Sequence, residues 1–406
     1  MARRVVITGC GVVSAGGNEL DAFWNSLVSG KTLIGVVTNF TCPEMDALTG
    51  AEAVLTADEF GMGLAEKDPV AGRCALLGLG AARRALAHAG LSAGDPALAD
   101  AGVVFGSTMA EERQVSNLSE RWVAQGADGV DGGFLTRADN HKLAACVADA
   151  FGMGGPVLLN ATACSSGNAS IAWGYDAVAD GVADVMLAGG ADTFTHSLFC
   201  GFSRMSALSK TVCKPFDKAR DGVSFGEGAG MLVLEELAHA KARGARILAE
   251  VLGYGLSNDA YHVTAPEPNG AGFVRAIQQA LTSSGTPAER VDYICAHGTG
   301  TQYNDQGEVR AMKAVFGERA TRIPISSIKS TIGHTNGAAG AIAAIACVLS
   351  LDHQMVPPTA NLAEPDPEFG MDFVMDRGRS ATLSTCLNLS AGFGGANACL
   401  LLARVS

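Results

Sequence analysis

The stretch GPVLLNATACSSG, residues 155–167, determines the architecture expected for this chain. An apolar run of strand character ends in small residues and continues into a segment of helical composition. This order predicts a strand, a tight turn and a helix, with Cys164 in the turn. A thiol at a helix N-terminus faces the positive end of the helix dipole, which lowers its pKa. We therefore expect Cys164 to be a nucleophile with a lowered pKa.

Two histidines lie in comparable turns farther along the chain. His297 is part of AHGT (296–299) and His334 is part of GHTNG (333–337), and apolar residues precede each turn. One cysteine and two histidines in glycine-flanked turns fit a nucleophile with two partners for protons or charge. Taken singly, Cys164 could be an inert core thiol and His297 a structural turn residue, so the pattern alone leaves both interpretations open.

Strand-like runs alternate with helical segments along the whole chain. Strands are expected at 5–8, 102–106, 157–159, 185–188, 231–234, 247–254, 293–297, 325–328 and 398–402, and helices at 73–89, 167–179, 272–283 and 305–316. This alternation predicts an α/β fold with mixed sheets covered by helices. The strand and turn at 156–164 are echoed at 323–334, which indicates a duplication with halves at 1–245 and 246–406.

Composition limits the classes of function. The chain has 406 residues, 48% of them hydrophobic and 17% charged, and a net charge of −12, which gives no bulk attraction to nucleic acid or anionic membrane. Its 11 cysteines form no CxxC pair and no regular framework, so we expect free thiols, no metal site and a cytoplasmic location. The apolar stretch 337–351 is too short for a membrane span and predicts a buried helix.

Seven segments, in this order along the chain, resemble one enzyme family. They are TACSSG (162–167), KPFDKARDG (214–222), GEGAG (226–230), SNDAYH (257–262), AHGTGT (296–301), KSTIGH (329–334) and GFGG (392–395). Together they resemble the elongating β-ketoacyl-acyl-carrier-protein synthases, condensing enzymes with a thiolase fold. The resemblance implies two duplicated mixed-sheet halves in a layered α-β-α-β-α arrangement.

The resemblance also implies the central chemistry, a decarboxylative condensation that forms a carbon–carbon bond. Cys164 is expected to take an acyl chain from acyl carrier protein, with the backbone N–H groups of Cys164 and Phe393 as the oxyanion hole. His297 and His334 are expected to bind the malonyl thioester and stabilise the enolate that forms as CO₂ leaves. The family's reaction requires no metal and no organic cofactor, because decarboxylation drives it.

Supporting residues follow from the same motifs. Lys329 and Glu308 are expected to organise the charges around the histidines, and Thr299 and Thr301 to bind the phosphopantetheine arm of the carrier protein. The KPFDKARDG segment is interpreted as an ion-paired structural loop.

Two loops are expected to open and close the acyl pocket. One begins at Asp259 and runs to residue 268; the other contains Gly392 and the gate residue Phe393. His262 and Thr264 are expected to contact substrate from the first loop, with packing inside the loop as the alternative for His262.

Partners are implied as well. The resemblance predicts an acyl carrier protein and a dimer, either with an identical chain or with a chain-length-factor-like homologue. Low charge and many small residues agree with a large covered surface. Arg204 and Lys210 are candidates for carrier-protein docking, and ordinary solvated loop charges are the alternative.

The pathway is left between two main alternatives. The segment QYNDQGE (302–308) is more similar to polyketide ketosynthases, which favours a specialised type II pathway such as one that makes a polyene. A fatty acid elongation synthase is the second choice. A non-catalytic chain-length factor normally lacks the cysteine, and a degradative thiolase uses a second cysteine near the C-terminus, where Cys386 and Cys399 are candidates.

Overall fold

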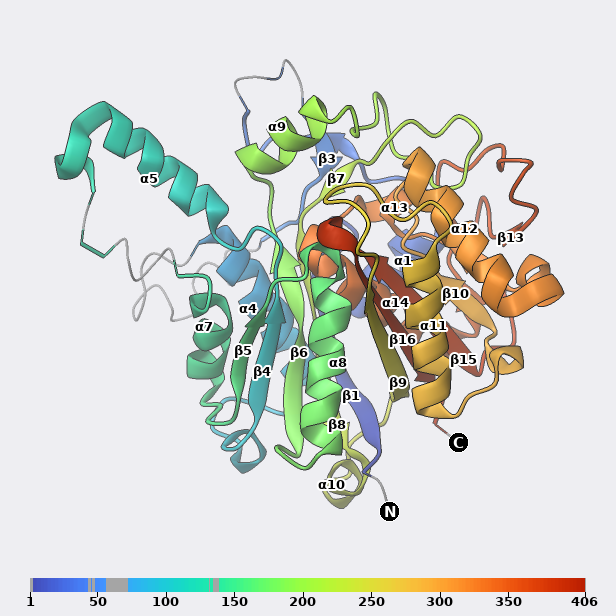
Figure 1. The fold of residues 1–406 in the computed structure, drawn as a ribbon. Helices are drawn as coiled ribbons and strands as arrows, with labels where there is room; N and C mark the ends of the chain where they lie inside the picture. Colours follow the sequence, from blue (N-terminus) through green and yellow to red (C-terminus); the bar gives the residue numbers. More distant parts are fainter. Residues whose placement is uncertain are drawn as a thin grey trace.

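A computed structural model describes residues 3–42, 45, 48–55, 72–130, 132–133 and 139–405. Within them, eleven strands form one sheet in the order β13-β11-β10-β15-β16-β9-β1-β8-β6-β4-β5 (Figure 1). Their bounds are β1 Val5–Ser14, β4 Gly102–Gly106, β5 Val157–Asn160, β6 Val185–Asp192, β8 Gly228–Glu236, β9 Ala249–Asn258, β10 Tyr293–Cys295, β11 Pro324–Ser326, β13 Asp372–Phe373, β15 Thr385–Ala391 and β16 Ala396–Ala403.

The sheet consists of two halves with the same order and direction of strands. In the first half, β5, β4 and β6 are parallel, and β8 and β1 continue antiparallel. In the second, β11, β10 and β15 are parallel, and β16 and β9 continue antiparallel. Strands β1 and β9 pair antiparallel and join the halves. This repeated order confirms the duplication that the two strand–turn segments indicate.

Helices cover the half-sheets and separate them. Helices α4 (Arg73–His88) and α7 (Lys142–Phe151) pack on the first half-sheet, and α11 (Ala271–Ser284) packs on β9 and β16 of the second, with α12 (Gln302–Phe316) against α11. Helices α8 (Ser166–Ala179) and α14 (Ala339–His353) pack on each other between the halves. The α-β-α-β-α arrangement is therefore confirmed. The described residues also form the α-helices α1 (Leu20–Val28), α5 (Glu112–Gln125), α9 (His196–Arg204), α10 (Leu237–Ala242) and α13 (Lys329–Ile332).

Small residues bring the two central helices into contact. A β-carbon on Gly167 would lie 2.6 Å from the Ala341 nitrogen, and one on Gly340 would lie 2.7 Å from the Asn168 nitrogen. Such distances admit only glycine, since a larger residue would push the helices apart. Among the described residues, the segment Asn336–His353 is long and apolar enough to cross a membrane, but 89% of it is buried in the protein. It is a core helix, as predicted.

Two strands of the main sheet, β13 and β15, are absent from the sequence-based expectation. Strand β15 carries the polar residues Asn388 and Ser390, which interrupt its apolar pattern. The amide of Asn388 is buried and donates to the side chain of Asn168 and to the Gly340 carbonyl, both at 2.9 Å. The polar side chain therefore joins the central layer. Smaller strands form a β2-β3-β7 sheet (Gly35–Val36, Thr49–Ala51, Phe225–Gly226) and a β12-β14 pair (Met355–Val356, Arg379–Ser380).

Candidate active site

Cys164 lies in a turn between β5 and α8, as the sequence predicts. Strand β5 ends at Asn160, and a 3-10 turn over Ala163–Ser165 leads into α8. Ala163 adopts a left-handed φ of 50°, an uncommon conformation for a residue other than glycine. The Ser166 hydroxyl accepts the N–H of Thr162 at 2.9 Å, which ties the start of the turn to the start of the helix. The turn thus fixes the direction of the Cys164 side chain.

Two backbone donors converge on the Cys164 sulfur. The N–H groups of Cys164 and Phe393 both lie beside it and lower the pKa of the thiol. Phe393 can approach because its neighbour is glycine: a β-carbon on Gly392 would lie 3.0 Å from the Cys164 nitrogen and 2.9 Å from the Thr162 carbonyl. Two N–H groups directed at one point can bind the oxyanion of a thioester under attack at Cys164.

The expectation of a lowered thiol pKa is wrong for this state of the protein. Burial raises the pKa of Cys164 to about 12, the carboxylate of Asp192 adds to the rise, and Lys329 opposes it. The start of α8 therefore does not compensate for the loss of water around the sulfur. Cys164 is a neutral thiol before substrate enters.

The two histidines lie together as neutral rings. The ring centroids of His297 and His334 are 5.4 Å apart. Nδ1 of His334 accepts the Asn336 N–H at 3.2 Å, so its proton is on Nε2. Nδ1 of His297 is buried and has no hydrogen-bond partner in the described part of the chain. Burial lowers the pKa of both rings well below the usual value, and Lys329 lowers each further. Both rings are therefore neutral at neutral pH. His334 can donate a hydrogen bond from Nε2, and the Nδ1 of His297 can accept a proton or donate a hydrogen bond.

Glu308 and Lys329 lie around His297 as expected. The Glu308 carboxylate accepts the N–H groups of His297 and Gly298 at 2.5 and 2.8 Å, so it holds the backbone of the histidine turn. Burial raises the pKa of Glu308 to about 7 and lowers the pKa of Lys329, while each group's charge opposes the other's shift. Both are on elements of the second half, α12 and α13.

Cys164, His297 and His334 line a pocket that encloses about 610 Å³ of empty space, part of it open to solvent. Its wall includes Thr299 and Thr301, whose hydroxyl oxygens are 2.9 Å apart. Thr264 also lines the pocket, but His262 does not: it is exposed, and its Nδ1 accepts the N–H groups of Thr264 and Ala265 at 3.1 Å. The structure thus places His262 in the packing of its own loop. The full lining is Cys164, Phe202, Val223, Asp259, Thr264, Ala265, Pro266, His297, Thr299, Thr301, Asn304, His334, Ala391, Gly392, Phe393, Gly395 and Asn397.

The two expected gating loops are hydrogen-bonded to each other. The Gly394 N–H donates to the Val263 carbonyl at 2.7 Å, and the Asp259 N–H donates to the Gly395 carbonyl at 2.8 Å. The Asp259 carboxylate also accepts the Asn397 amide at 2.7 Å. If one loop moves, it must therefore either break these hydrogen bonds or take the other loop with it.

Sequence reasoning missed two residues of the site. Phe202, on α9, stacks on Phe393 with ring centroids 4.9 Å apart. Asp192, at the end of β6, is fully buried and accepts the Gly337 N–H at 2.6 Å and the Ser107 hydroxyl at 2.6 Å. The AGGADT run after an apolar strand is a signal for Asp192, because small residues and a carboxylate at a strand end mark a close approach of backbone. No comparable signal distinguishes Phe202.

The docking candidates lie on the surface near the pocket. Arg204 is exposed and follows Phe202 by two residues on α9, and Lys210 is exposed in the loop beyond it. Lys218, in the same basic region, pairs with Glu364 at 2.5 Å. Docking of a carrier protein at Arg204 and Lys210 stays a prediction.

Metal binding has no candidate cluster in the part of the chain that the structure describes. No group of three or more histidine, cysteine, aspartate or glutamate side chains is arranged there to hold a metal ion.

Comparisons with known families match this chain over most of its length. Residues 2–240 match the model of the β-ketoacyl synthase N-terminal domain, and residues 248–363 match the model of the C-terminal domain. The two models together cover both halves of the duplicated fold.

Relatives and solved structures agree with these matches. Nodulation protein E of Rhizobium meliloti is 40% identical, with 100% of both chains covered. The actinorhodin polyketide putative β-ketoacyl synthase 1 of Streptomyces coelicolor is 40% identical over 99% of this chain and 89% of its own, and the 3-oxoacyl-[acyl-carrier-protein] synthase 2 of Coxiella burnetii is 36% identical over 99% of each.

Among solved structures, the ishigamide ketosynthase/chain length factor matches with a TM-score of 0.92 at 37% identity, and the ketosynthase complex AntDE:AntF with a TM-score of 0.89 at 32% identity; each match covers 100% of both chains. The site combines one cysteine with two histidines, and these ketosynthases share its fold. Both observations agree with the family matches over residues 2–240 and 248–363. The chain belongs to the β-ketoacyl synthase family of condensing enzymes.

Proposed function

We propose that this β-ketoacyl synthase joins a malonyl unit on acyl carrier protein to an acyl chain held on Cys164, in a specialised type II polyketide pathway. The observation that carries the proposal is one pocket lined by Cys164, His297 and His334, with the N–H groups of Cys164 and Phe393 beside the sulfur. That set supplies a nucleophile, an oxyanion hole and two groups for an enolate in one place.

In the first step, Cys164 attacks the thioester carbonyl of an acyl-carrier protein. Because its pKa is raised to about 12, the thiol loses its proton as the carbon–sulfur bond forms, and a neutral histidine ring is positioned to accept it. The two N–H groups stabilise the tetrahedral oxyanion. The carrier's pantetheine sulfur leaves and takes up the proton, which returns the histidine to its neutral form.

In the second step, the malonyl thioester carbonyl binds at His297 and His334. Nε2–H of His334 donates to that oxygen, since Nδ1 is already occupied by Asn336. Loss of CO₂ leaves the electron pair as an enolate, whose carbon attacks the acyl carbonyl on Cys164. A carbon–carbon bond forms and the carbon–sulfur bond to Cys164 breaks. The thiolate that leaves takes up a proton from solvent, which restores the thiol. Decarboxylation provides the electron pair, so the step uses no metal or organic cofactor.

The polyketide assignment draws on the relatives and on one segment of the site. The actinorhodin relative is a polyketide enzyme by name, and the ishigamide and AntDE:AntF structures are ketosynthases of related systems. The segment 302–308, similar to polyketide ketosynthases, places Asn304 in the pocket wall. Fatty acid elongation is the second candidate, and it is favoured by the identity to the Coxiella burnetii 3-oxoacyl synthase.

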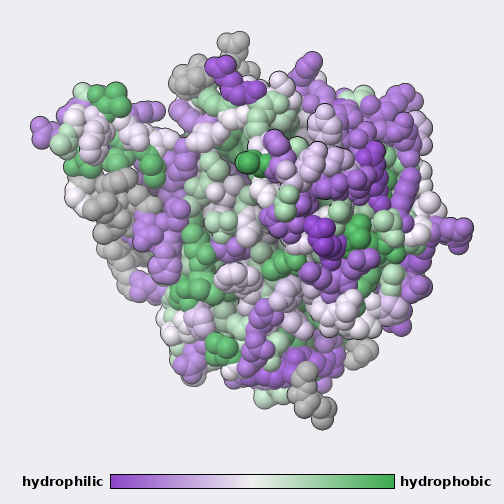
Figure 2. All heavy atoms as spheres, in the orientation of Figure 1, coloured by the Kyte–Doolittle hydropathy of each residue, from purple (hydrophilic) through white to green (hydrophobic). Residues whose placement is uncertain are grey.

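A homologous subunit is proposed to pair at β5. This strand is an edge of the main sheet, and its Leu158 is 39% exposed (Figure 1). Trp173 on α8 and Trp122 on α5, a helix that projects from the body of the molecule, are also exposed. Figure 2 shows hydrophobic side chains on this face. An open edge with exposed apolar residues is suited to pairing with another chain, either an identical one or a chain-length-factor-like one.

The proposed carrier protein docks beside the pocket mouth, at Arg204 and Lys210. An acidic carrier would be attracted to these exposed basic side chains although the whole chain is negative. Charge reversal of either residue should weaken carrier binding if the assignment is right, and unchanged affinity would remove it. The eleven cysteines, which form no CxxC pair and no regular framework, agree with a reducing, cytoplasmic location.

The test uses purified protein, malonyl-carrier protein and a panel of saturated and 2,4-unsaturated acyl-carrier proteins, with intact-protein mass spectrometry as the readout. Preference for unsaturated chains, or activity that needs a homologous partner, supports the polyketide proposal. Efficient condensation of saturated chains by this chain alone supports fatty acid elongation instead. A Cys164→Ala variant must carry no acyl group; if the wild type also carries none with any substrate, the proposed role of Cys164 fails.

A further inference from the structure

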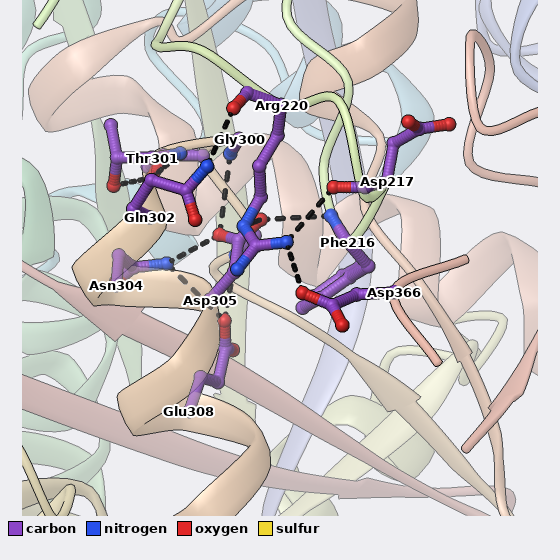
Figure 3. A network of polar contacts seen from close by, with 12 residues as sticks. Phe216, Asp217, Arg220, Gly300, Thr301, Gln302, Asn304, Asp305, Glu308 and Asp366 are labelled. Atoms are coloured by element: carbon purple, nitrogen blue, oxygen red, sulfur yellow. Dashed lines mark hydrogen bonds and ion pairs between the residues drawn. The ribbon is translucent and has the colours of Figure 1, made fainter. Parts of the chain in front are cut away.

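Arg220 lies in the KPFDKARDG loop, a motif to which the proposed reaction assigns no part. Its side chain is fully buried. The guanidinium reaches two other segments: Nη1 donates to Asp366 at 2.8 Å, and Nε lies 3.9 Å from the carboxylate of Asp305 on α12 (Figure 3). The ring of Phe369 lies 4.8 Å from the guanidinium carbon. Arg220 therefore links its own loop to the start of α12 and to the 366–369 segment.

Asp305 connects this arginine to the pocket wall. Its carboxylate accepts the N–H groups of Phe216 at 2.8 Å and Gly300 at 3.2 Å (Figure 3). Gly300 stands between Thr299 and Thr301, whose hydroxyl groups form part of the pocket wall. The carboxylate thus fixes the peptide between the two threonines.

The arginine's loop holds the same turn by a second route. The Arg220 carbonyl accepts the side-chain amide of Gln302 at 2.8 Å, and the Gly222 N–H donates to the Gly300 carbonyl at 3.1 Å. Gly300 is therefore held at its N–H by Asp305 and at its carbonyl by Gly222. Gly300 has a φ of 83°, so this turn depends on outside contacts for its shape.

Folding alone is a poor explanation for a charged residue at this point. Nε and Nη2 of Arg220 are buried and have no hydrogen-bond partner among the described residues. A buried guanidinium with unused donors costs folding free energy, and apolar replacements of buried ion pairs are often neutral or stabilising. A role in the site, beyond folding stability, accounts for the presence of Arg220 behind the pocket wall.

We propose that Arg220 is a positioning residue which, through Asp305, sets the Thr299–Thr301 turn for the phosphopantetheine arm of the substrate. The proposal rests on the proposed function and on the pantetheine-binding role that the family resemblance implies for the two threonines. His297 is held by Glu308, whose carboxylate is linked to Asp305 through the Asn304 amide (Figure 3), so the kinetic split between KM and kcat distinguishes the two effects. Arg220 acts on substrate binding and leaves the groups at the reacting carbon in place.

The experiment measures steady-state kinetics for malonyl-carrier protein in Arg220→Met, Arg220→Lys and a matched control, Arg243→Met. Arg243 also pairs with a buried carboxylate, that of Glu235, through two hydrogen bonds of 2.7 Å. This pair lies in another part of the fold, with Arg243 at the end of α10 and Glu235 on β8. Arg220→Met should raise KM about tenfold while kcat changes less than about threefold, the pattern of lost binding without lost chemistry. Arg220→Lys keeps the charge, so its KM should lie between those of the wild type and Arg220→Met. Arg243→Met should alter neither KM nor kcat.

Several results would overturn the inference. These are an unchanged KM in Arg220→Met, a fall in kcat alone, or the same kinetic change in Arg243→Met. If Arg220→Met does not fold, as judged by thermal unfolding, Arg220→Lys decides, with a raised KM expected. The KM effect should persist with malonyl-pantetheine; an effect confined to carrier-bound substrate would assign Arg220 to docking and also overturn it. Failure of the wild type to condense would instead count against the proposed function.

Discussion

The rings of His297 and His334 stand at 86° to each other with centroids 5.4 Å apart. The two histidines follow the ends of different elements. His297 comes after β10, and His334 comes after α13. With Nδ1 of His334 occupied by a backbone N–H, its Nε2–H is fixed as a donor. This arrangement makes His334 a hydrogen-bond donor whose direction does not depend on pH near neutrality.

His334→Ala should lower decarboxylation of malonyl-carrier protein about a hundredfold or more, the typical effect of removing one donor to a developing oxyanion. Acyl transfer to Cys164 should be less affected, because the oxyanion hole for that step is formed by backbone N–H groups and contains no histidine. Release of CO₂ and acylation by mass spectrometry measure the two steps separately. His239→Ala is the control, since His239 pairs with Glu235 on α10. Equal loss in both steps would contradict the assignment.

Alkylation of Cys164 tests the protonation state of the thiol. Because burial raises its pKa to about 12, the thiolate fraction and the iodoacetamide rate should increase about tenfold per pH unit from pH 7 to 9. Peptide mass spectrometry at Cys164 gives the rate at each pH. A plateau below pH 8 would show that the start of α8 lowers the pKa after all.

Gly392→Ala should reduce acyl transfer by about a hundredfold, because the new methyl group would push Phe393 and its N–H away from the sulfur. Stopped-flow acylation by an acyl-carrier protein measures the step. Gly35→Ala is a matched control, since a β-carbon at Gly35 meets no atom within 4 Å. Unaltered acylation in Gly392→Ala would mean that the Phe393 N–H is not needed.

Leu158→Asp should weaken subunit pairing about thirtyfold or more, since a charge would replace an apolar residue at the centre of the proposed contact. Analytical ultracentrifugation over a concentration series measures the change. Val36→Asp introduces the same charge at an exposed valine in β2, outside the main sheet. A normal assembly in Leu158→Asp would place the partner elsewhere.

The local pattern around Cys164 predicts the strand, turn and helix that the structure contains. The strand, turn and helix were readable because small residues follow an apolar run at 155–167, and the same pattern near His334 indicated the duplication. Strand β15 escaped prediction, since Asn388 is polar yet buried against Asn168. Phe202 was not predicted, because no feature of the neighbouring sequence indicates that it stacks on the distant Phe393.

Sequence by itself determined the duplicated α/β fold and singled out Cys164, His297 and His334 as candidates, because these depend on local turns and on the alternation of strands and helices. Only the tertiary structure decided the thiol's protonation, since burial around Cys164 outweighs the helix dipole that the sequence suggests. It also decided that Arg220 contacts Asp305, 85 positions away in the numbering, and so reaches the pocket wall. Electrostatic effects of burial and contacts between distant segments depend on the packed fold, and no local pattern contains them.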